Sequence, residues 1–207
     1  IFLKVPTFIL HPGIRGDRGH NSLDHALKDE NKEWGVVILK ANEELDGGDI
    51  YAQVNFKMRD SYKASIYRNE VSDATIKALT KLLQNLQNKN FQPIKQLKTP
   101  LHPYLTQKDR VIDWHKDTTK EIIKKIHLSD SYPGVRDELL GIECYLFGAH
   151  EEKTLRGEPK EIIAKRDGAI CVATVDGALW ISHMQELGSF KLPSTYVLKQ
   201  KIKGIKE

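Results

Sequence analysis

Cysteine, methionine and aromatic residues are scarce in this chain, and long apolar runs are missing. Its 207 residues include two cysteines, two methionines and 8% aromatic residues. Cys144 and Cys171 lie in apolar stretches without a Cys-x-x-Cys partner or a nearby histidine, so we expect reduced core thiols and no metal site. No apolar run approaches the roughly 20 residues of a membrane helix, and no signal peptide is visible. These absences predict a cytoplasmic protein with no membrane partner.

A strong charge of one sign is also missing. The formal net charge is +4, and part of it comes from the lysine-rich end, residues 199–206. Nucleic-acid-binding proteins typically carry a basic stripe with interleaved aromatic residues, and none is evident. No Walker motif is present, and the glycines of 13–19 have the wrong spacing for a dinucleotide-binding fingerprint. We therefore expect small-molecule substrates rather than nucleic acid.

What the chain does have is two glycine-rich loops, each placed after a strand-like apolar run. His11 ends the first run and enters the loop 12–19, and Asp46 lies in the second loop with Gly47 and Gly48. Two strand ends can bring such residues together, and a histidine–aspartate pair is a ready general acid and base. We predict that His11 and Asp46 form such a pair, with the aspartate fixing the tautomer and charge of the imidazole.

These two loops carry a family resemblance. The chain resembles the folate-dependent formyltransferases, such as methionyl-tRNA formyltransferase, in which His-Pro ends one strand and a Leu-Asp-x-Gly turn supplies an aspartate. Within that superfamily, residues 11–19 are most similar to a hydrogenase-maturation branch. The likeness continues in order through 65–71, 109–114 and 166–171, and it ends near 190–193. It covers nearly the whole sequence.

The resemblance implies a fold, a reaction and substrates. The implied fold is α/β: part of a Rossmann-like formyltransferase domain with a mainly parallel sheet, followed by a small OB-like β-barrel domain. The implied reaction moves the formyl group of N10-formyl-tetrahydrofolate to coenzyme A, without a metal. It is a step towards the carbon monoxide ligand of nickel–iron hydrogenase, so the maturation machinery is an indirect partner. Because the sequence starts at Ile1, just before the His11 motif, we expect a fragment of a longer enzyme.

The chemistry of formyl transfer assigns roles to the paired residues. The reaction passes through a tetrahedral oxyanion, which needs a hydrogen-bond donor and a group that moves the nucleophile's proton. The resemblance gives these roles to His11 and Asp46, with Asp49 as the weaker candidate. The alternatives are a structural histidine beside a proline turn and a turn aspartate that bonds its own backbone. Ile9 stands where the formyltransferases place asparagine, so one donor to the formyl oxygen is missing.

The same loops hold candidate binding residues. Arg15 and Arg18 follow Gly13 on the first loop, where they can bind an anionic acceptor such as a phosphate of coenzyme A. A mobile, solvated loop is the alternative. Gly47 and Gly48 complete the predicted binding set in the second loop.

Hydrophobic periodicity predicts the elements of the first part. Apolar and alternating runs predict strands over 7–11, 35–39 and 50–56, and Asn21 or Ser22 can cap a short helix between the first two. A longer helix follows, with apolar residues at spacings of three and four that we expect to face the core. These residues are Ile76, Leu79, Leu82, Leu83 and Leu86.

The second part has a different texture. Thr118 and Glu121 form a potential capping box at a helix start. Short strands at 142–147, 161–165, 169–174 and 178–182 are separated by glycine turns that favour hairpins. The predicted organisation is the C-terminal part of a catalytic domain over 1–95, a proline-containing linker over 96–107, an OB-like domain over 108–198 and a basic tail over 199–207.

Two other functions stay open on the sequence. One is amine formylation of the methionyl-tRNA type, against which the mild charge and the short loop after His11 argue. The other is a non-catalytic module that holds folate or coenzyme A, with Ile9 marking a dead site. The identity of the formyl acceptor is the question that the sequence leaves unanswered.

Overall fold

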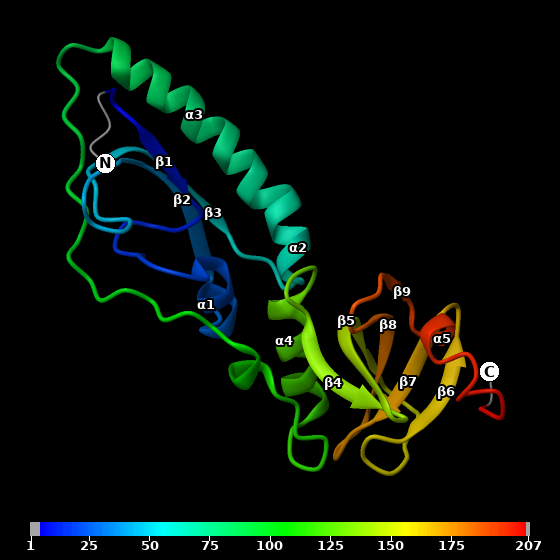
Figure 1. Ribbon diagram of the computed structural model, residues 1–207. Helices are drawn as coiled ribbons and strands as arrows, with labels where there is room; N and C mark the ends of the chain where they lie inside the picture. Colours follow the sequence, from blue (N-terminus) through cyan, green and yellow to red (C-terminus); the bar gives the residue numbers. More distant parts are fainter. Residues whose placement is uncertain (1–4, 206–207) are drawn as a thin grey trace. The chain divides into compact units, whose positions relative to one another are not determined.

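The computed structural model describes residues 5–205, which divide into two compact units between Leu105 and Thr106. Each unit has its own sheet and its own apolar core (Figure 1). Within the described range, no helix has the length and hydropathy needed to span a membrane. The same range holds no group of three or more His, Cys, Asp or Glu side chains placed to bind a metal ion.

The first unit is built on three antiparallel strands. They are β1 (Phe8–His11), β2 (Glu33–Lys40) and β3 (Ile50–Lys57), in the order β1-β2-β3. The prediction of a mainly parallel sheet is therefore wrong for these strands. An apolar run indicates that both faces of a strand are buried but not its direction. The connection 41–49 does carry a signal, because a parallel crossover needs about a dozen residues or more.

Helices flank this sheet. The predicted short helix is α1 (Ser22–Lys28); its N-cap residue, Asn21, has a φ of 55° and accepts a hydrogen bond from the Leu105 amide (3.0 Å) through its side chain. After β3 the chain runs through α2 (Lys63–Ile66), a π-helical turn (Tyr67–Val71) and α3 (Ser72–Gln87), which packs on β2 and β3. Figure 1 shows α3 alongside the sheet.

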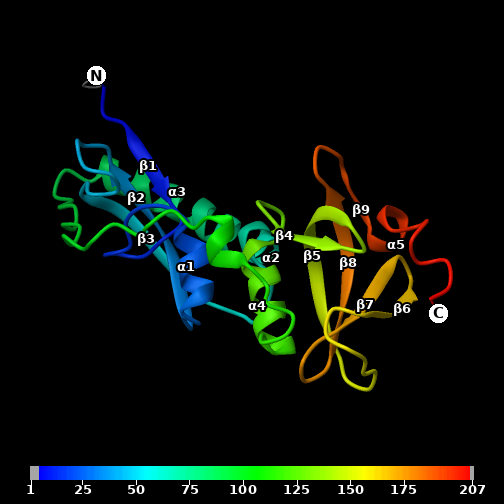
Figure 2. The same cartoon turned by 60° about the horizontal axis from the view of Figure 1, so that its bottom comes forward.

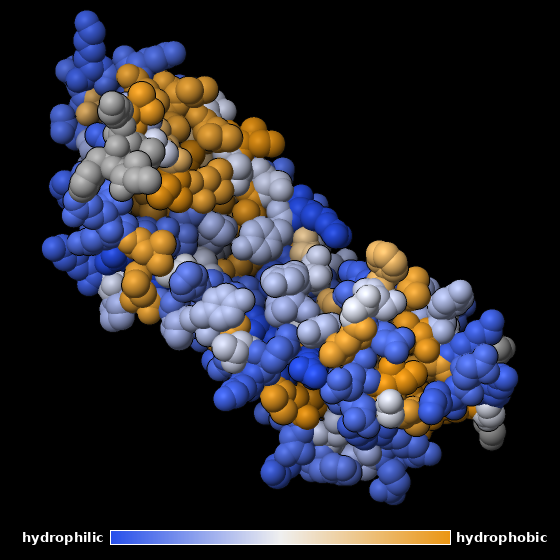
Figure 3. Space-filling model, viewed as in Figure 1, coloured by the Kyte–Doolittle hydropathy of each residue, from blue (hydrophilic) through white to orange (hydrophobic). Residues whose placement is uncertain are grey.

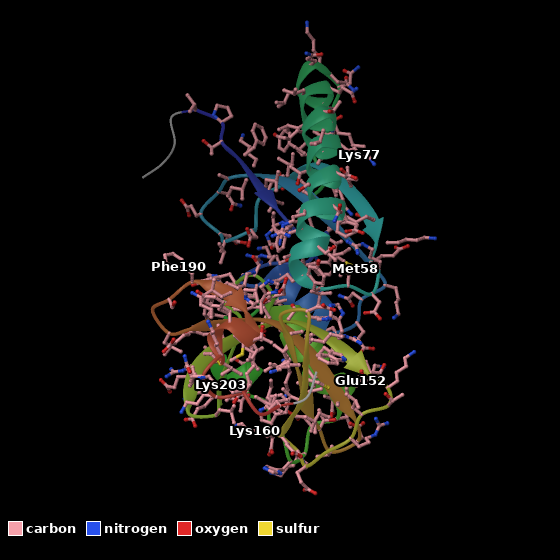
Figure 4. The ribbon with its side chains drawn as sticks, turned by 90° about the vertical axis from the view of Figure 1, so that its right-hand side faces the viewer. Met58, Lys77, Glu152, Lys160, Phe190 and Lys203 are labelled. Carbon is pink, nitrogen blue, oxygen red and sulfur yellow. The ribbon has the colours of Figure 1, made fainter. Side chains whose placement is uncertain are left out.

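The face that α3 turns to the sheet is not the predicted one. Ala74, Ala78 and Leu82 are buried, at a spacing of four residues. The small alanines let the helix approach the strands closely, so the larger apolar side chains lie outside. Of the predicted core stripe only Leu82 is buried, and the other members are between 44% and 65% exposed: Ile76, Leu79, Leu83 and Leu86. Hydrophobic surface covers this part of the unit in Figure 3, and Lys77 projects from α3 in Figure 4.

The segment 88–105 belongs to the first unit. It runs back along the unit in extended conformation (Figure 1), with Ile94 paired to Ile50 and His102 paired to Gly19. Prolines disfavour a helix here but are compatible with an extended chain. The part of this segment that the sequence indicates as a linker is thus a structural strap of the first unit, and it lies against the loops that carry the predicted site.

The second unit combines a helix with a six-stranded antiparallel sheet (Figure 2). Its helix, α4 (Thr119–Ser129), begins with the predicted capping box, in which Thr118 Oγ1 accepts from the Glu121 amide (3.3 Å) and Glu121 Oε2 accepts from the Thr118 amide (2.8 Å). The strand order is β4-β5-β8-β7-β6, with β9 on β8. The strands are β4 (Val135–Leu139), β5 (Ile142–Glu152), β6 (Ile162–Arg166), β7 (Ala169–Ala173), β8 (Ala178–Glu186) and β9 (Lys191–Pro193). A 3-10 turn (Gln107–Arg110) precedes α4, and a short helix, α5 (Ser194–Val197), follows β9.

Strand pairing does not close this sheet into a barrel. Strands β4 and β6 stand at opposite ends of the strand order and do not pair with each other within the described residues. An ion pair between Lys160 and Asp137 (3.4 Å) links the segment before β6 to β4 instead; Lys160 is labelled in Figure 4. The predicted OB-like barrel is therefore not confirmed, because local hairpin signals specify sequential neighbours and not closure. Ile202 is buried in the core and Ile205 packs against it, so part of the predicted basic tail is packed.

Candidate functional site

The structure brings His11 and Asp46 together, as the sequence predicts. His11 is the last residue of β1, and its Nδ1 lies 3.6 Å from Asp46 Oδ1. Both side chains are buried. The separation is too long for a hydrogen bond, so the two groups face each other with a gap between them. The pair is a confirmed juxtaposition, and its catalytic role stays a prediction.

The sequence predicted that two strand ends bring these residues together, and the structure does so in a different way. His11 pairs with Val37 in the middle of β2, because the strands are antiparallel. The loop 41–49 folds back to carry Asp46 to His11. The loop is held by backbone: the Gly19 amide donates to Asp46 Oδ2 (3.0 Å), and Asp46 itself has a left-handed φ of 49°. Aspartate tolerates that conformation better than most residues.

A second carboxylate, which the sequence analysis missed, lies closer to His11. A 2.6 Å hydrogen bond joins His11 Nε2 and Asp17 Oδ2. The Ser22 hydroxyl lies 2.5 Å from the same oxygen and donates to it. Asp17 is 3% exposed. Its place in a loop rich in glycine and arginine suggested a solvated residue, and only the proximity of the first turn of α1 could have pointed to its burial.

The strap 88–105 supplies a third wall of the site. His102 Nε2 lies 3.1 Å from Asp17 Oδ1, and the His102 ring stacks on His25 with centroids 4.4 Å apart. Gln96 Nε2 donates to the Asp46 carbonyl (3.2 Å), and Thr99 Oγ1 donates to the Gly16 carbonyl (2.6 Å). The strap therefore joins the two predicted loops. These partners are about 50 to 85 residues from the loops in sequence, so no local pattern could have indicated them.

The two loop arginines are in different environments. Arg18 is buried, and its guanidinium donates to the Leu45 carbonyl (3.1 Å), the Thr99 carbonyl (3.4 Å) and Glu44 Oε2 (3.2 Å). Arg15 is exposed and donates one hydrogen bond, from Nε to the Lys95 carbonyl (2.9 Å). Arg18 thus ties the two loops together, and Arg15 is the better placed of the two for an anion.

The predicted binding glycines pack against the loops at close range. A Cβ on Gly13 would lie 2.2 Å from Asp17 Oδ2 and 2.5 Å from His11 Nε2, so the backbone at Gly13 covers the His11–Asp17 hydrogen bond. A Cβ on Gly48 would lie 1.8 Å from the Lys40 carbonyl oxygen, and one on Gly47 would lie 2.5 Å from Glu44 Cβ. A side chain at any of these three positions would clash with its neighbours, so glycine is needed for the two loops to pack this closely.

Two further elements, α1 and the π-helical turn, carry ionisable side chains that interact electrostatically with each other and with Asp17. Burial raises the pKa of Tyr67, and the charges of Asp24 and Asp17 raise it further. Tyr67 begins the π-helical turn, a feature that is frequent at functional sites. Asp24 is itself buried and paired with Lys63 Nζ (3.0 Å), which compensates for burying both charges. The weaker catalytic candidate from the sequence, Asp49, pairs instead with Lys95 (2.8 Å) and is partly exposed.

Comparison with known proteins agrees with this architecture. Residues 104–201 match the family model for the formyl transferase C-terminal domain. The chain is 38% identical to the hydrogenase maturation factor HoxX of Bradyrhizobium diazoefficiens over 95% of its own length and 36% of that protein. It is 31% identical to the methionyl-tRNA formyltransferase of Fervidobacterium nodosum over 91% of its length and 62% of that enzyme.

The solved structure of a related protein agrees with these sequence comparisons. HypX from Aquifex aeolicus, crystallised with tetrahydrofolic acid, superposes with a TM-score of 0.94 at 45% identity over 99% of this chain and 36% of HypX. Residues 104–201 are thus a formyl transferase C-terminal domain, and the chain as a whole is a homologue of HypX and HoxX. It spans little more than a third of the length of these HypX and HoxX relatives.

Proposed function

We propose that this chain is the formyl-transfer part of an enzyme that moves the formyl group of N10-formyl-tetrahydrofolate to coenzyme A. The main support is the buried His11–Asp46 pair. This pair lies in a chain that is 45% identical, over 99% of its length, to a HypX whose structure was solved in complex with tetrahydrofolic acid. The product would serve carbon monoxide ligand synthesis during nickel–iron hydrogenase maturation, which makes the maturation machinery an indirect partner.

The reaction requires one acyl transfer and one net proton transfer. The acceptor thiol loses its proton and its sulfur attacks the formyl carbon. The bond between that carbon and N10 then breaks, and N10 takes up a proton, giving formyl-coenzyme A and tetrahydrofolate. His11 and Asp46 face each other across 3.6 Å, and both can exchange a proton at the reacting atoms. Once it has taken up a proton, His11 can also donate a hydrogen bond to the oxyanion.

A thiol acceptor suits the residues present better than an amine. Ile9 occupies the position of the family asparagine, and its side chain cannot donate a hydrogen bond to the formyl oxygen. Loss of one oxyanion donor typically costs about 10²–10³-fold in rate. A thiol with a pKa near 8.5 ionises at modest cost, so it tolerates a poorer oxyanion site than an amine does. Exposed Arg15 is the proposed contact for an anionic group of the acceptor.

A competition experiment tests this function. The natural full-length protein is incubated with labelled formyl-tetrahydrofolate in the presence of both coenzyme A and initiator methionyl-tRNA. We expect labelled formyl-coenzyme A or carbon monoxide as the main product. The similarity to methionyl-tRNA formyltransferases makes formyl-methionyl-tRNA the principal competing outcome, and its dominance would overturn the proposal. Folate binding without any transfer would identify a non-catalytic module.

A further inference from the structure

The two nitrogens of the His11 ring have different partners, and this difference carries an inference that rests on the proposed function. Nε2 is held by Asp17 Oδ2 at hydrogen-bond distance (2.6 Å). Nδ1 faces Asp46 Oδ1 across 3.6 Å without a hydrogen bond. One side of the ring is therefore anchored, and the other side faces a gap.

The hydrogen-bond chemistry fixes which nitrogen carries the proton. An ionised carboxylate only accepts, so the hydrogen at Nε2 must come from the imidazole. In the neutral ring this leaves Nδ1 with a lone pair directed towards the Asp46 carboxylate. Two acceptors facing each other require a proton between them, which the incoming nucleophile or the ring itself must supply. Nδ1 is the nitrogen placed to take or give a proton.

The contacts around Asp17 hold the anchor in place. Ser22 Oγ lies 2.5 Å from Asp17 Oδ2 and 2.7 Å from the Pro12 carbonyl, which also accepts from Trp34 Nε1 (2.9 Å). His102 Nε2 lies 3.1 Å from the other oxygen, Oδ1. The backbone at Gly13 lies so close to this hydrogen bond that a Cβ there would clash with both His11 Nε2 and Asp17 Oδ2.

We propose that Asp17 is the positioning residue of this site: it fixes the His11 ring as the Nε2–H tautomer and thereby makes Nδ1, opposite Asp46, the reactive nitrogen. In this assignment Asp46 does not set the tautomer, as predicted from the sequence, but lies beside Nδ1 as the second group that can take or give the proton. Ser22 and His102 act through Asp17. The arrangement follows the general logic of a base oriented by a third group.

The decisive variant is Asp17→Asn in the natural full-length protein, with Asp49→Asn as the matched control. An asparagine amide can donate to Nε2 and so favours the opposite, Nδ1–H tautomer. We expect kcat for formyl transfer to fall by roughly 10²–10⁴-fold with little change in KM for formyl-tetrahydrofolate. Nitrogen NMR of histidine-labelled protein, with the His11 signals identified by their loss in His11→Gln, should show the tautomer change. Asp49→Asn should change neither quantity.

Gentler variants keep the proposal testable where Asp17→Asn fails to fold. Ser22→Ala and His102→Leu should each lower kcat less than Asp17→Asn does, and His102→Gln, which retains a donor near Asp17 Oδ1, should restore most of the rate. A wild-type ring with its proton on Nδ1, or normal kcat in folded Asp17→Asn, overturns the assignment. If the wild-type protein transfers no formyl group and yet shows the Nε2–H tautomer, the proposed function fails and the orienting role of Asp17 stands.

Discussion

The two units bury different kinds of side chain. In the first unit, charged residues and histidines are buried together around His11 and α1: His11, Asp17, Arg18, Asp24, His25, Asp46 and Lys63. In the second unit, Arg110 and Asp130 are the buried charged residues within the described range, and the remaining buried polar groups are hydroxyls. Burying charge costs free energy unless each group is paired. The first unit carries that cost where the predicted chemistry lies, and the second is built as an apolar scaffold.

The units also differ in how far apart in the sequence their contacting residues lie. The second unit is made largely of sequential antiparallel pairs, such as β4 with β5, β6 with β7 and β7 with β8. The site of the first unit depends on the strap 88–105, whose Lys95, Gln96 and Thr99 bond residues about 80 positions earlier. Local signals therefore predict the second unit better, and the arrangement of the candidate site in the first unit is decided by distant partners.

The largest expected contrast between the units concerns histidine. His11→Ala in the full-length protein should lower formyl transfer by about 10²–10⁴-fold, because it removes the acid/base group of the site. His183→Ala, at an exposed position on β8, should leave the rate unchanged. Steady-state rates of both variants, with circular dichroism as the check on folding, provide the measurement. Near-normal turnover in His11→Ala would place the chemistry elsewhere.

Cysteine reactivity tests the apolar core of the second unit. Burial raises the pKa of the Cys144 thiol to about 12 and that of Cys171 to about 11. At about pH 8 the thiolate fractions in the folded state are then roughly 10⁻⁴ and 10⁻³, far below those of free cysteine. Iodoacetamide should label native protein very slowly and unfolded protein rapidly, as followed by mass spectrometry.

The same thiols give a pH dependence of defined sign. Their folded pKa values are raised, so the contribution is complete below the unfolded pKa of about 8.5 and is lost as pH rises above it. Unfolding midpoints of the second unit should therefore decline above about pH 9. Fast native labelling near neutral pH would show that these cysteines are not core residues.

The two loop aspartates sharpen the comparison inside the first unit. Asp46→Asn should lower kcat/KM by roughly 10²-fold, because the amide cannot exchange a proton opposite His11 as a carboxylate does. Asp49→Asn should have little effect, since Asp49 pairs with Lys95 at the surface. Parallel rate measurements on the two folded variants decide the matter. A larger loss in Asp49→Asn would mean that the roles within the second loop are reversed.

The smallest expected effect concerns the face of α3. Leu82→Ala should lower the free energy of unfolding of the 207-residue chain by about 2–4 kcal/mol, since Leu82 is buried against the sheet. Leu83→Ala, one position on but 62% exposed, should change it by about 0.5 kcal/mol or less. Urea unfolding of the two variants gives the comparison. Equal losses would show that the leucine stripe is packed, as its periodicity predicts.

Several features follow from the sequence because their causes are local. The spacing of apolar residues predicts β2, β3, α3 and the strands β5 to β8, and the pair Thr118 and Glu121 predicts the start of α4. The turn at Asp167 and Gly168, both with positive φ, forms the predicted hairpin. The approach of His11 to Asp46 was also predictable, because the string of residues in each loop resembles a known pair. In all these cases the information lies within a few residues of the feature.

Only the tertiary structure decided the strand directions, the exposed stripe of α3, the open sheet of the second unit and the surroundings of His11. A short apolar strand has the same composition whether its neighbour runs parallel or antiparallel, and an amphipathic helix can turn a stripe of alanines or of leucines to a sheet. Asp17 and His102 become neighbours because the strap returns along the sheet and brings a distant residue to the loop. The sequence by itself determined which residues are candidates for the chemistry, and the fold determined the partner of each nitrogen of the His11 ring, because burial and hydrogen-bond partners are set by contacts between segments far apart in the chain.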